Sequence, residues 1–178
     1  MKIAIILISE TSLAMAQTLQ KELPLSAIFS ASQVISEQGC RYIDSIQMFV
    51  SEAFTNYDAF IFIGAMGICV RSIAPCVKDK HTDPAVICVD STGRYAISVL
   101  SGHIGGANEL TKQVADILGA ESVITTQSDR TGLWALDTLD KQFGWYTAIS
   151  KNTEMNKVIS LFVNKAPTAL LLDVRDKG

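Results

Sequence analysis

The sequence lacks a long apolar run, a cluster of basic residues and a low-complexity segment. Its apolar start, residues 3–8, is much shorter than the roughly 20 residues of a membrane-spanning helix, and Ser9 and Glu10 follow it in place of a cleavage site. The 15 Lys and Arg residues are scattered and the net charge is −3, which is unlike the basic patch of a nucleic-acid-binding protein. We therefore expect neither a membrane nor a nucleic acid as a partner.

Cysteine is also scarce, and the four cysteines form no Cys-x-x-Cys pair and no spacing typical of secreted proteins. We expect reduced thiols in a cytoplasmic protein. A metal site that uses Cys69, Cys76 and His81 is an alternative, but its spacing matches no familiar zinc arrangement. We expect no metal ligands in this chain.

Several motifs with well-understood chemistry are absent. Ser101 has no Gly-x-Ser-x-Gly elbow around it, so a serine hydrolase triad is a poor hypothesis and water is the better nucleophile. The glycine-bearing turns at residues 64–67 and 101–108 have neither the Gly-Lys-Ser/Thr ending of a phosphate-binding loop nor a complete Gly-x-Gly-x-x-Gly fingerprint. Nucleotide binding therefore ranks below other functions.

What the sequence does contain is an alternation of apolar runs and segments with helical periodicity. The isoleucine-rich run at residues 2–8 is typical of a strand buried on both faces of a parallel sheet, and Ser12 is placed to cap a helix over residues 13–23. Residues 91–94 predict a hairpin between two strand-like runs. We expect an α/β fold: three αβα layers, with a mostly parallel sheet and at least one antiparallel hairpin. Further strands are expected at residues 25–29, 59–63, 85–89, 95–100 and 122–125, and further helices at 44–54, 67–74 and 108–118.

The same alternation restarts after residue 126. Helices are expected at residues 133–142 and 154–162, and strands at 146–149 and 169–174. We place a domain boundary near residue 130: residues 1–130 form an N-terminal α/β domain with the glycine turns, and residues 131–178 begin a second, central α/β region. Because the last strand-like run has nothing after it to complete a fold, we expect the chain to be a fragment of a longer polypeptide.

The candidate site consists of the two glycine-bearing turns, each of which leads from a strand into a helix. Glycine permits close approach of a ligand, and the first amides of a helix favour an anion. If the strands before the turns are neighbours, both turns face one pocket; alternatively, the glycines only let the helices pack on the sheet. The expected substrate-binding residues are Gly64, Gly67, Arg71, Lys80, Ser101, Gly102, Gly105, Gly106 and Asn108.

His103 is the first candidate for proton transfer. An imidazole on an exposed turn titrates near neutral pH and can both accept and donate a proton. The alternatives are that His103 caps the helix or binds the substrate through a hydrogen bond. Asp83 is the reserve base, and His81, in the charged segment 77–84, is a weaker candidate.

Residues 64–108 form a long block that resembles the signature block of the cobalamin biosynthesis protein G family of the anaerobic corrin pathway: GAMGICVRSIAPCVKDKHTDPAVICVDSTGRYAISVLSGHIGGAN. The similarity continues through residues 109–111 and 123–126. The resemblance implies a cobalt-precorrin 5A hydrolase, which opens a δ-lactone on a cobalt-bound tetrapyrrole and releases acetaldehyde. Cobalt would enter within the substrate, so no cofactor is expected. Full-length members are expected to have N-terminal, central and C-terminal domains, of which this chain covers the first and part of the second.

The resemblance suggests a reaction for the candidate residues. Water would attack the lactone carbonyl with His103 as general base or as donor to the leaving oxygen, and amides of the two turns would stabilise the developing charge. The alternatives are a non-catalytic tetrapyrrole-binding module of a longer polypeptide and a nucleotide-binding α/β domain. A homodimer, and contact with other enzymes of the corrin pathway, are the protein partners considered.

Overall fold

The computed structural model describes residues 1–36 and 38–126 and, beyond them, residues 136, 139, 143–146, 148, 154–164, 166, 167 and 169. The chain divides into two compact units, Met1–Thr126 and Gln127–Gly178. The assignment of residues 1–130 to an N-terminal domain and of residues 131–178 to a central region stays a prediction.

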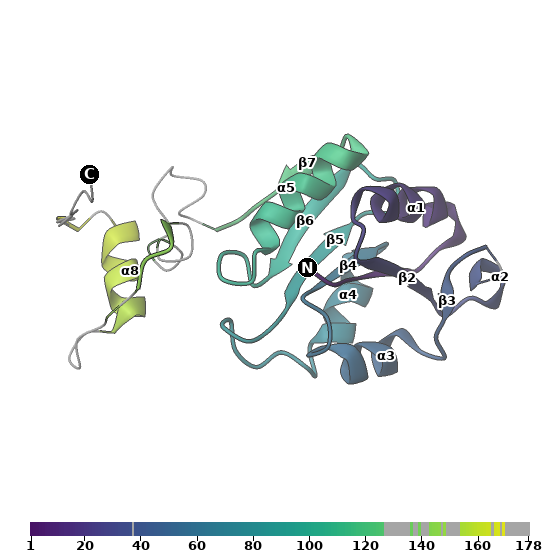
Figure 1. Ribbon diagram of the computed structural model, residues 1–178, viewed down its shortest axis with the longest axis horizontal. Helices are drawn as coiled ribbons and strands as arrows, with labels where there is room; N and C mark the ends of the chain where they lie inside the picture. The colour runs from purple at the N-terminus through teal and green to yellow at the C-terminus, as the bar shows by residue number, and fades with distance from the viewer. Residues whose placement is uncertain are drawn as a thin grey trace. The chain divides into compact units, whose positions relative to one another are not determined.

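The first unit is a seven-stranded sheet with helices on both faces, in the strand order β3-β2-β1-β4-β5-β6-β7 (Figure 1). All neighbouring strands are parallel except β5 and β6. The predicted three-layer α/β fold with one antiparallel hairpin is therefore confirmed. The strands are β1 Ile3–Leu7, β2 Ser26–Ser30, β3 Arg41–Tyr42, β4 Ala59–Ile63, β5 Ala85–Val89, β6 Tyr95–Leu100 and β7 Glu121–Val123. The helices are the 3-10 turn η1 Glu10–Ser12, α1 Leu13–Glu22, α2 Gln33–Ser36, α3 Ile46–Ala53, α4 Met66–Ile73 and α5 Ala107–Leu118.

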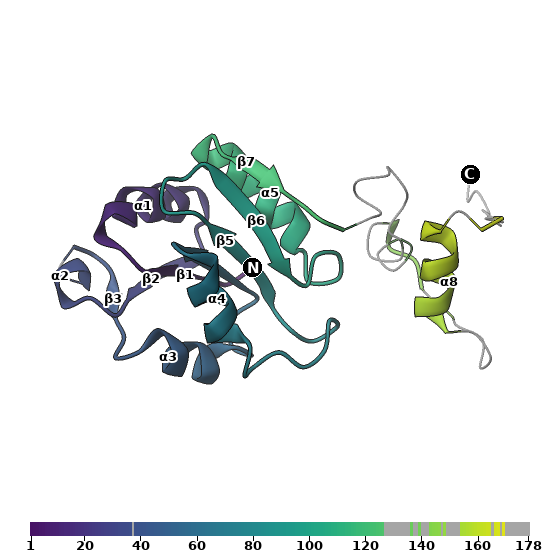
Figure 2. The same ribbon diagram turned by 180° about the vertical axis from the view of Figure 1, so that it is seen from behind.

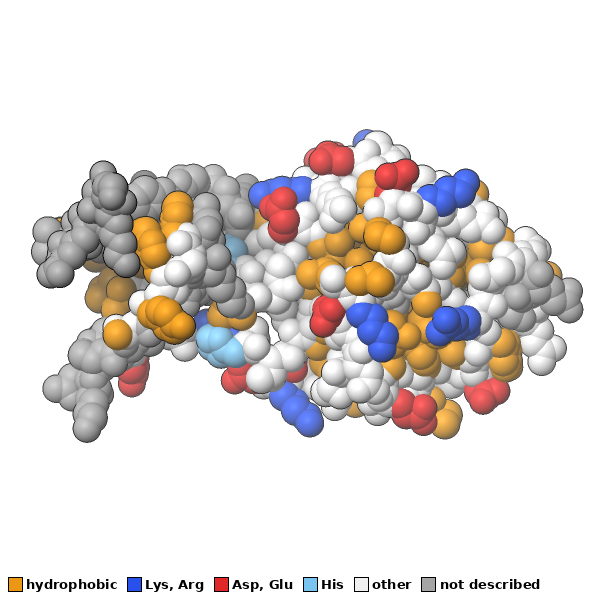
Figure 3. Space-filling view, viewed as in Figure 1, with side chains coloured by type: hydrophobic (Ala, Val, Ile, Leu, Met, Phe, Trp, Pro, Cys, Tyr) orange, Lys and Arg blue, Asp and Glu red, His pale blue; other side chains and the backbone are white. Residues whose placement is uncertain are grey.

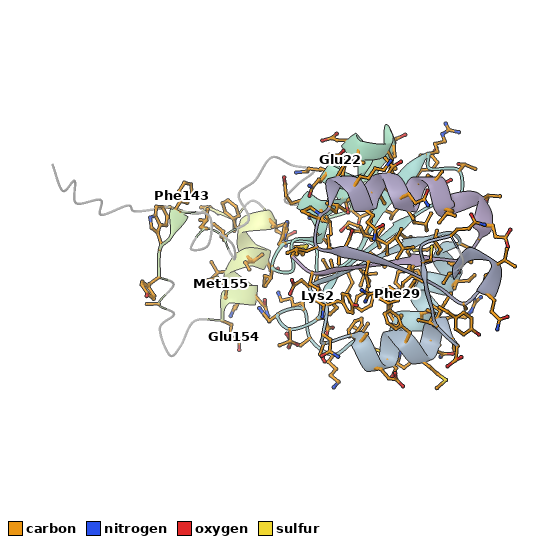
Figure 4. All side chains as sticks on the ribbon, turned by 45° about the vertical axis from the view of Figure 1, so that its right-hand side comes forward. Lys2, Glu22, Phe29, Phe143, Glu154 and Met155 are labelled. Atoms are coloured by element: carbon orange, nitrogen blue, oxygen red, sulfur yellow. The ribbon has the colours of Figure 1, made fainter. Side chains whose placement is uncertain are left out.

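Two apolar layers hold the helices on the sheet. Strands β1, β4 and β5 are buried at all five of their positions, which explains why their sequences are continuously apolar rather than alternating. Helices α1 and α5 pack on one face, and α3 and α4 pack on the other. Figure 4 shows Glu22 on the α1 side, and Lys2 and Phe29 on the α3 side.

Asp90 closes the hairpin between β5 and β6. Its carboxylate accepts hydrogen bonds from the backbone amides of Thr92, at 3.0 Å, and Tyr95, at 2.6 Å. Burial by itself would raise the pKa of Asp90, but the hydrogen bonds from Thr92 and Tyr95 outweigh burial and hold the pKa below its ordinary value. This stabilisation is fully present above the pKa of the unfolded chain and is lost as the pH falls through the lowered pKa of the folded hairpin.

The hairpin gives the sheet two chemically different edges. The carboxyl ends of β1, β2, β4 and β5 lie at one edge, which we call the Gly64 edge after the residue that follows β4. The carboxyl ends of β6 and β7 lie at the other, which we call the Ser101 edge after the residue that follows β6. The loop after β6 and the loop between α4 and β5 extend to the same side of the first unit (Figure 1).

The second unit contains the described helix α8, Met155–Val163, which confirms the helix predicted over residues 154–162. The rings of Phe143 and Trp145 stack in this unit with centroids 4.7 Å apart. The other elements predicted here, at residues 133–142, 146–149 and 169–174, fall on segments of which only isolated positions belong to the described residues. None of the described helices has the length and apolar character needed to span a membrane.

Ser12 does not cap α1 as predicted. The preceding residues coil into η1, so Ser12 has φ −95° and ψ 0° instead of the extended backbone that a capping residue needs, and it makes no capping bond. Its side chain is fully buried, and its Oγ finds no hydrogen-bond partner within the described part of the chain. Ser45, in contrast, has extended backbone before α3 and its Oγ accepts from the amide of Met48 at 3.5 Å.

These two serines predict stability changes of opposite sign. Ser12→Ala removes a buried hydroxyl without a partner and should raise the free energy of unfolding by about 1 kcal/mol. Ser45→Ala removes a working cap and should lower it by about 1 kcal/mol. Urea unfolding followed by circular dichroism measures both. A loss of stability in Ser12→Ala equal to that in Ser45→Ala would contradict the absence of a partner for Ser12.

Candidate functional site

The two glycine-bearing turns lie at opposite edges of the sheet, so the prediction that they share a pocket is wrong. Ile63, which ends β4, pairs with Val89, and Val89 pairs with Ala96 near the start of β6. Leu100, which ends β6, pairs with Val86, so the ends of β4 and β6 are separated by roughly 10 Å along the strands. The hairpin is the physical reason, because it reverses β6.

At the Gly64 edge, the first turn is closed by packing. Gly64 has φ +148°, and a Cβ built on it would lie 2.7 Å from Cδ1 of Ile8. Its amide donates to the carbonyl oxygen of Val89 at 2.8 Å. Glycine is required here for the close approach of Ile8, and its amide is already used within the protein.

Arg71 and Gly67 also lie at the Gly64 edge, on α4. The Arg71 guanidinium donates to the carbonyl oxygen of Gly67 at 3.1 Å. Arg71 lines a cavity of about 370 Å³ between α3 and α4, which Asp44 and Ser45 also line. These two predicted binding residues are therefore separated from the turn at residues 101–108, and an acidic side chain shares their cavity.

At the Ser101 edge, the second turn is joined to the charged loop between α4 and β5. Ser101 has a left-handed backbone, with φ +58°, which is uncommon for a residue other than glycine. Its Oγ donates to the carbonyl oxygen of Asp83 at 2.9 Å. A Cβ built on Gly105 would lie 2.4 Å from Cβ of Ser101, so the turn closes tightly on this serine.

The amides at the start of α5 are not directed at a ligand, which corrects the expectation that they stabilise an anion. The amide of Gly106 donates to the carbonyl of His103 at 3.0 Å, that of Ala107 to Ser101 at 3.1 Å, and that of Asn108 to Gly102 at 2.9 Å. Because these three donors already have acceptors, we expect side chains to contribute to the binding of a ligand at this edge.

Asn108 links three segments at the Ser101 edge. Its Oδ1 accepts from Ser98 Oγ on β6, and its Nδ2 donates to Thr126 Oγ1 beyond β7, both at 2.8 Å. Asn108 is only 5% exposed, and a Cβ on Gly102 would lie 2.9 Å from its Oδ1. Sequence analysis did not identify Thr126 as a site residue. The signal that could have identified it is the parallel pairing of β6 with β7, which places Thr126 beside Asn108.

The charged loop is folded around Asp83. The Asp83 carboxylate is buried and its Oδ2 accepts from the amides of Lys78, at 2.8 Å, and Asp79, at 3.0 Å. Asp79 in turn accepts from the amide of His81 at 2.7 Å. These bonds give Asp83 a positioning role and leave Lys78 and Lys80 exposed on the loop.

His103 lies half-buried in the second turn, at the same edge as this loop. The structure thus brings together part of the predicted site, namely Lys80, Asp83, Ser101, Gly102, His103, Gly105, Gly106 and Asn108. Their roles in binding or catalysis stay predictions. Within the residues that the structure describes, no three His, Cys, Asp or Glu side chains gather as a metal ion would require.

The four cysteines are free thiols, and two of them meet in the core between α4 and β5. The side-chain hydrogen bond with Cys88 and burial both raise the pKa of Cys69. Cys88 Sγ also donates to the carbonyl oxygen of Gly64 at 3.5 Å. Both thiols are almost fully buried, so they contribute to packing beneath the first turn.

Comparison with known families identifies the relatives of this chain. Residues 48–129 match the family described as Cobalamin synthesis G N-terminal, and residues 134–178 match the Cobalamin biosynthesis central region. The chain belongs to the cobalamin biosynthesis protein G family. The resemblance predicted from residues 64–108 is confirmed.

Curated members of this family are longer than the chain. The chain is 46% identical over 138 residues to the Cobalt-precorrin-5A hydrolase of Salmonella typhimurium, covering 77% of the chain and 39% of that protein. It is 38% identical over 182 residues to the Cobalt-precorrin-5A hydrolase of Priestia megaterium, covering 98% of the chain and 48% of that protein. The chain therefore spans less than half the length of these relatives.

A solved structure supports the fold. A cobalamin biosynthesis protein G homologue from Sulfolobus solfataricus superimposes with a TM-score of 0.53, over 86% of this chain and 51% of that one. At 20% sequence identity, this likeness establishes the fold alone.

The tight turn at the Ser101 edge predicts a steric effect on stability. Gly105→Ala should lower the free energy of unfolding by about 2 kcal/mol, because the new methyl group meets the Ser101 backbone as well as its side chain. Gly67→Ala is the matched control, since its methyl group meets only the flexible Arg71 side chain, at 3.4 Å, and should leave stability unchanged or slightly raised. Equal effects of the two substitutions in urea unfolding would contradict the packing of this turn.

Proposed function

We propose that this chain supplies the N-terminal part of a cobalt-precorrin-5A hydrolase and that the δ-lactone is opened at the Ser101 edge. The family and the names of its relatives support the pathway and the reaction class. The observation on which the site depends is the hydrogen bond from Ser101 to Asp83, which joins the His103 turn to the loop that bears Lys80. This joint brings a proton-transfer group and an exposed cation to one edge.

In the proposed reaction, His103 accepts a proton from water as the water oxygen bonds to the lactone carbonyl carbon. The single bond between the lactone carbonyl carbon and the ring oxygen then breaks, and His103 returns the proton to this leaving oxygen. Hydrolysis consumes one water molecule and leaves a carboxylic acid and a free hydroxyl group on the two-carbon unit. This hydroxyl then loses its proton as the carbon–carbon bond to the macrocycle breaks, the macrocycle takes up the bonding electron pair and a proton, and the two-carbon unit leaves as acetaldehyde. Because the amides of Gly106 to Asn108 already have acceptors, the ammonium of Lys80 is proposed to stabilise the negative oxygen.

A second candidate function is a tetrapyrrole-binding module whose chemistry is completed elsewhere in a longer polypeptide. The observation that favours it is the length of the relatives, of which this chain spans 39% and 48%. Nucleotide binding has less support, because the amides of Ala107 and Asn108, the first two of α5, already donate to the turn. In either candidate, cobalt is proposed to enter with the substrate, and a cytoplasmic location stays a prediction.

Acetaldehyde release from cobalt-precorrin-5A by the full-length polypeptide tests the role of His103. His103→Ala should lower kcat by at least about 100-fold, which is the usual contribution of a general acid or base. His81→Ala is the matched control, because His81 is the other histidine of this chain and is exposed on the loop; its kcat should stay within about twofold of the parent.

Undiminished turnover in His103→Ala would remove His103 from the mechanism. The isolated chain, titrated with the same substrate, separates the two candidate functions. Turnover by the isolated chain supports the enzyme, whereas tight binding without turnover supports the module.

A further inference from the structure

Strand β6 has a face that no helix of the first unit covers. Strands β1, β4 and β5 are buried throughout, whereas only Ala96 is buried in β6, and its other five residues are partly exposed. Helix α5 packs on β6 and β7 from one side. Figure 2 shows β6 from the other side, where the described part of the first unit places no helix over it.

The side chains on this uncovered face are mainly apolar. Ser98 points toward α5, since it bonds Asn108, so its neighbour Ile97 points the other way. Val99 lies on the same side as Ile97, because it packs partly buried against the apolar core beneath α3 and α4. Register adds Val123 of β7 beside Ile97, and Tyr95 and its register partner Glu121, which is exposed, lie two residues earlier on the same side. We call these four residues, Tyr95, Ile97, Val99 and Val123, the open face. The two strands lie about 4.8 Å apart with a rise of about 3.3 Å per residue, so the open face is a two-strand apolar surface, with a β-bulge at Val99 where β6 pairs with β5.

Helix α4 adds a wall beside the open face. Its side toward α3 bears Ile68 and Ser72, which line the cavity between the two helices. Val70 comes two residues after Ile68, about 200° around the helix, and is therefore directed away from α3 and toward the β6 side. Val70 is 45% exposed and Val77, just beyond α4, is 41% exposed, so this wall is apolar as well.

Cations stand at both ends of the open face. Arg94 lies in the hairpin with its guanidinium over the ring of Tyr95, 5.1 Å from the centroid. At the other end, the loop that bears Lys78 and Lys80 reaches the Ser101 edge from α4. A flat apolar ligand with carboxylates at its rim is the chemical complement of this surface.

Another described cavity does not suit the same ligand. This cavity of about 450 Å³ lies between the end of α1 and the start of α5 and is lined by Met1, Leu25 and Leu110, but also by Glu22 and Glu109. Figure 3 shows hydrophobic side chains gathered near the amino terminus on that face, with acidic groups close by. Two carboxylates at the cavity would repel an anionic ligand.

From this arrangement we infer that the tetrapyrrole macrocycle lies flat on the open face, with its rim carboxylates bound by Arg94 at one end and by Lys78 and Lys80 at the other. The inference rests on the proposed function and specifies which surface holds the substrate. It places the lactone-bearing rim at the Ser101 edge, where the strands lead into the His103 turn.

Charge substitutions at the hairpin end test the inference without disturbing the core. Arg94→Gln should weaken binding of cobyrinic acid, a corrin with free carboxylates, by about tenfold in calorimetry, as expected for loss of one charge-assisted hydrogen bond. Arg41→Gln is the matched control, because Arg41 is also exposed and lies over an aromatic ring, that of Phe29 on β2, which lies four strand positions from β6 in the sheet. Glu121, which register places beside Tyr95, gives the opposite sign: Glu121→Gln should strengthen binding.

An apolar substitution tests the floor of the surface. In the full-length polypeptide, Ile97→Asp should raise the Kd for cobyrinic acid and the KM for cobalt-precorrin-5A by at least about tenfold, because it places a charge against the ring and its carboxylates. Val34→Asp, an exposed apolar position on α2, should leave both values unchanged. Thermal unfolding checks that each variant is folded. If Ile97→Asp does not fold, the effect of Arg94→Gln on corrin binding decides the question.

The outcomes separate this inference from the proposed function. If Arg94→Gln and a folded Ile97→Asp bind the corrin as tightly as the parent while His103→Ala abolishes turnover, the proposed function stands and the open face is not the binding surface. If the parent releases no acetaldehyde but Arg94→Gln and Ile97→Asp still lose corrin binding, the surface stands without the reaction. If Ile97→Asp instead makes the full-length polypeptide sensitive to limited proteolysis with an unchanged Kd, another protein segment covers this face and the inference is overturned.

Discussion

Asp90 holds the hairpin between β5 and β6, and this hairpin reverses β6 within an otherwise parallel sheet. In a purely parallel sheet, all turns that lead from strands into helices gather at one edge, and a ligand lies in the crevice among them. Here the reversal sends the turn after β6 to the edge where β1, β2, β4 and β5 begin. The Gly64 turn and the His103 turn therefore face different solvent regions, and each has to be judged as a separate site.

The two edges differ in what they offer a ligand. At the Gly64 edge, the glycine serves close packing against Ile8, and its amide bonds Val89. At the Ser101 edge, backbone groups also bond one another, but the bonds build a frame that holds side chains of the charged loop near the His103 turn. Asp83 belongs to this frame because its Oδ2 accepts two amides, and the His103 turn and the exposed ammonium groups of the loop lie at the same edge.

Sequence reasoning predicted the fold class because β1, β4 and β5 are buried on both faces and their apolar runs are unmistakable. It missed α2 and β3, whose short segments include exposed Arg41 and Tyr42 and show no periodicity. It also predicted the hairpin, yet it still placed the two glycine-bearing turns at one edge. The hairpin reverses β6, and the direction of a strand relative to its neighbours depends on the whole topology. The prediction that Ser12 caps α1 was wrong for a local reason, because η1 replaces the extended backbone that a capping residue needs.

The open face follows from the same topology. A crossover between parallel strands is right-handed, so the face on which its helix lies depends on the strand direction and on the direction of the step across the sheet. The step from β6 to β7 runs across the sheet in the opposite direction to the step from β1 to β2, and β6 and β7 also run opposite to β1 and β2. The two reversals cancel, so α1 and α5 lie on the same face. The steps that lead to β4 and β5 run the other way along unreversed strands, which places α3 and α4 on the opposite face, where α4 packs on β5. Within the described residues of the first unit, the reversal that separates the two turns therefore also leaves β6 and β7 without a helix of their own on the α4 side, next to the edge that bears His103.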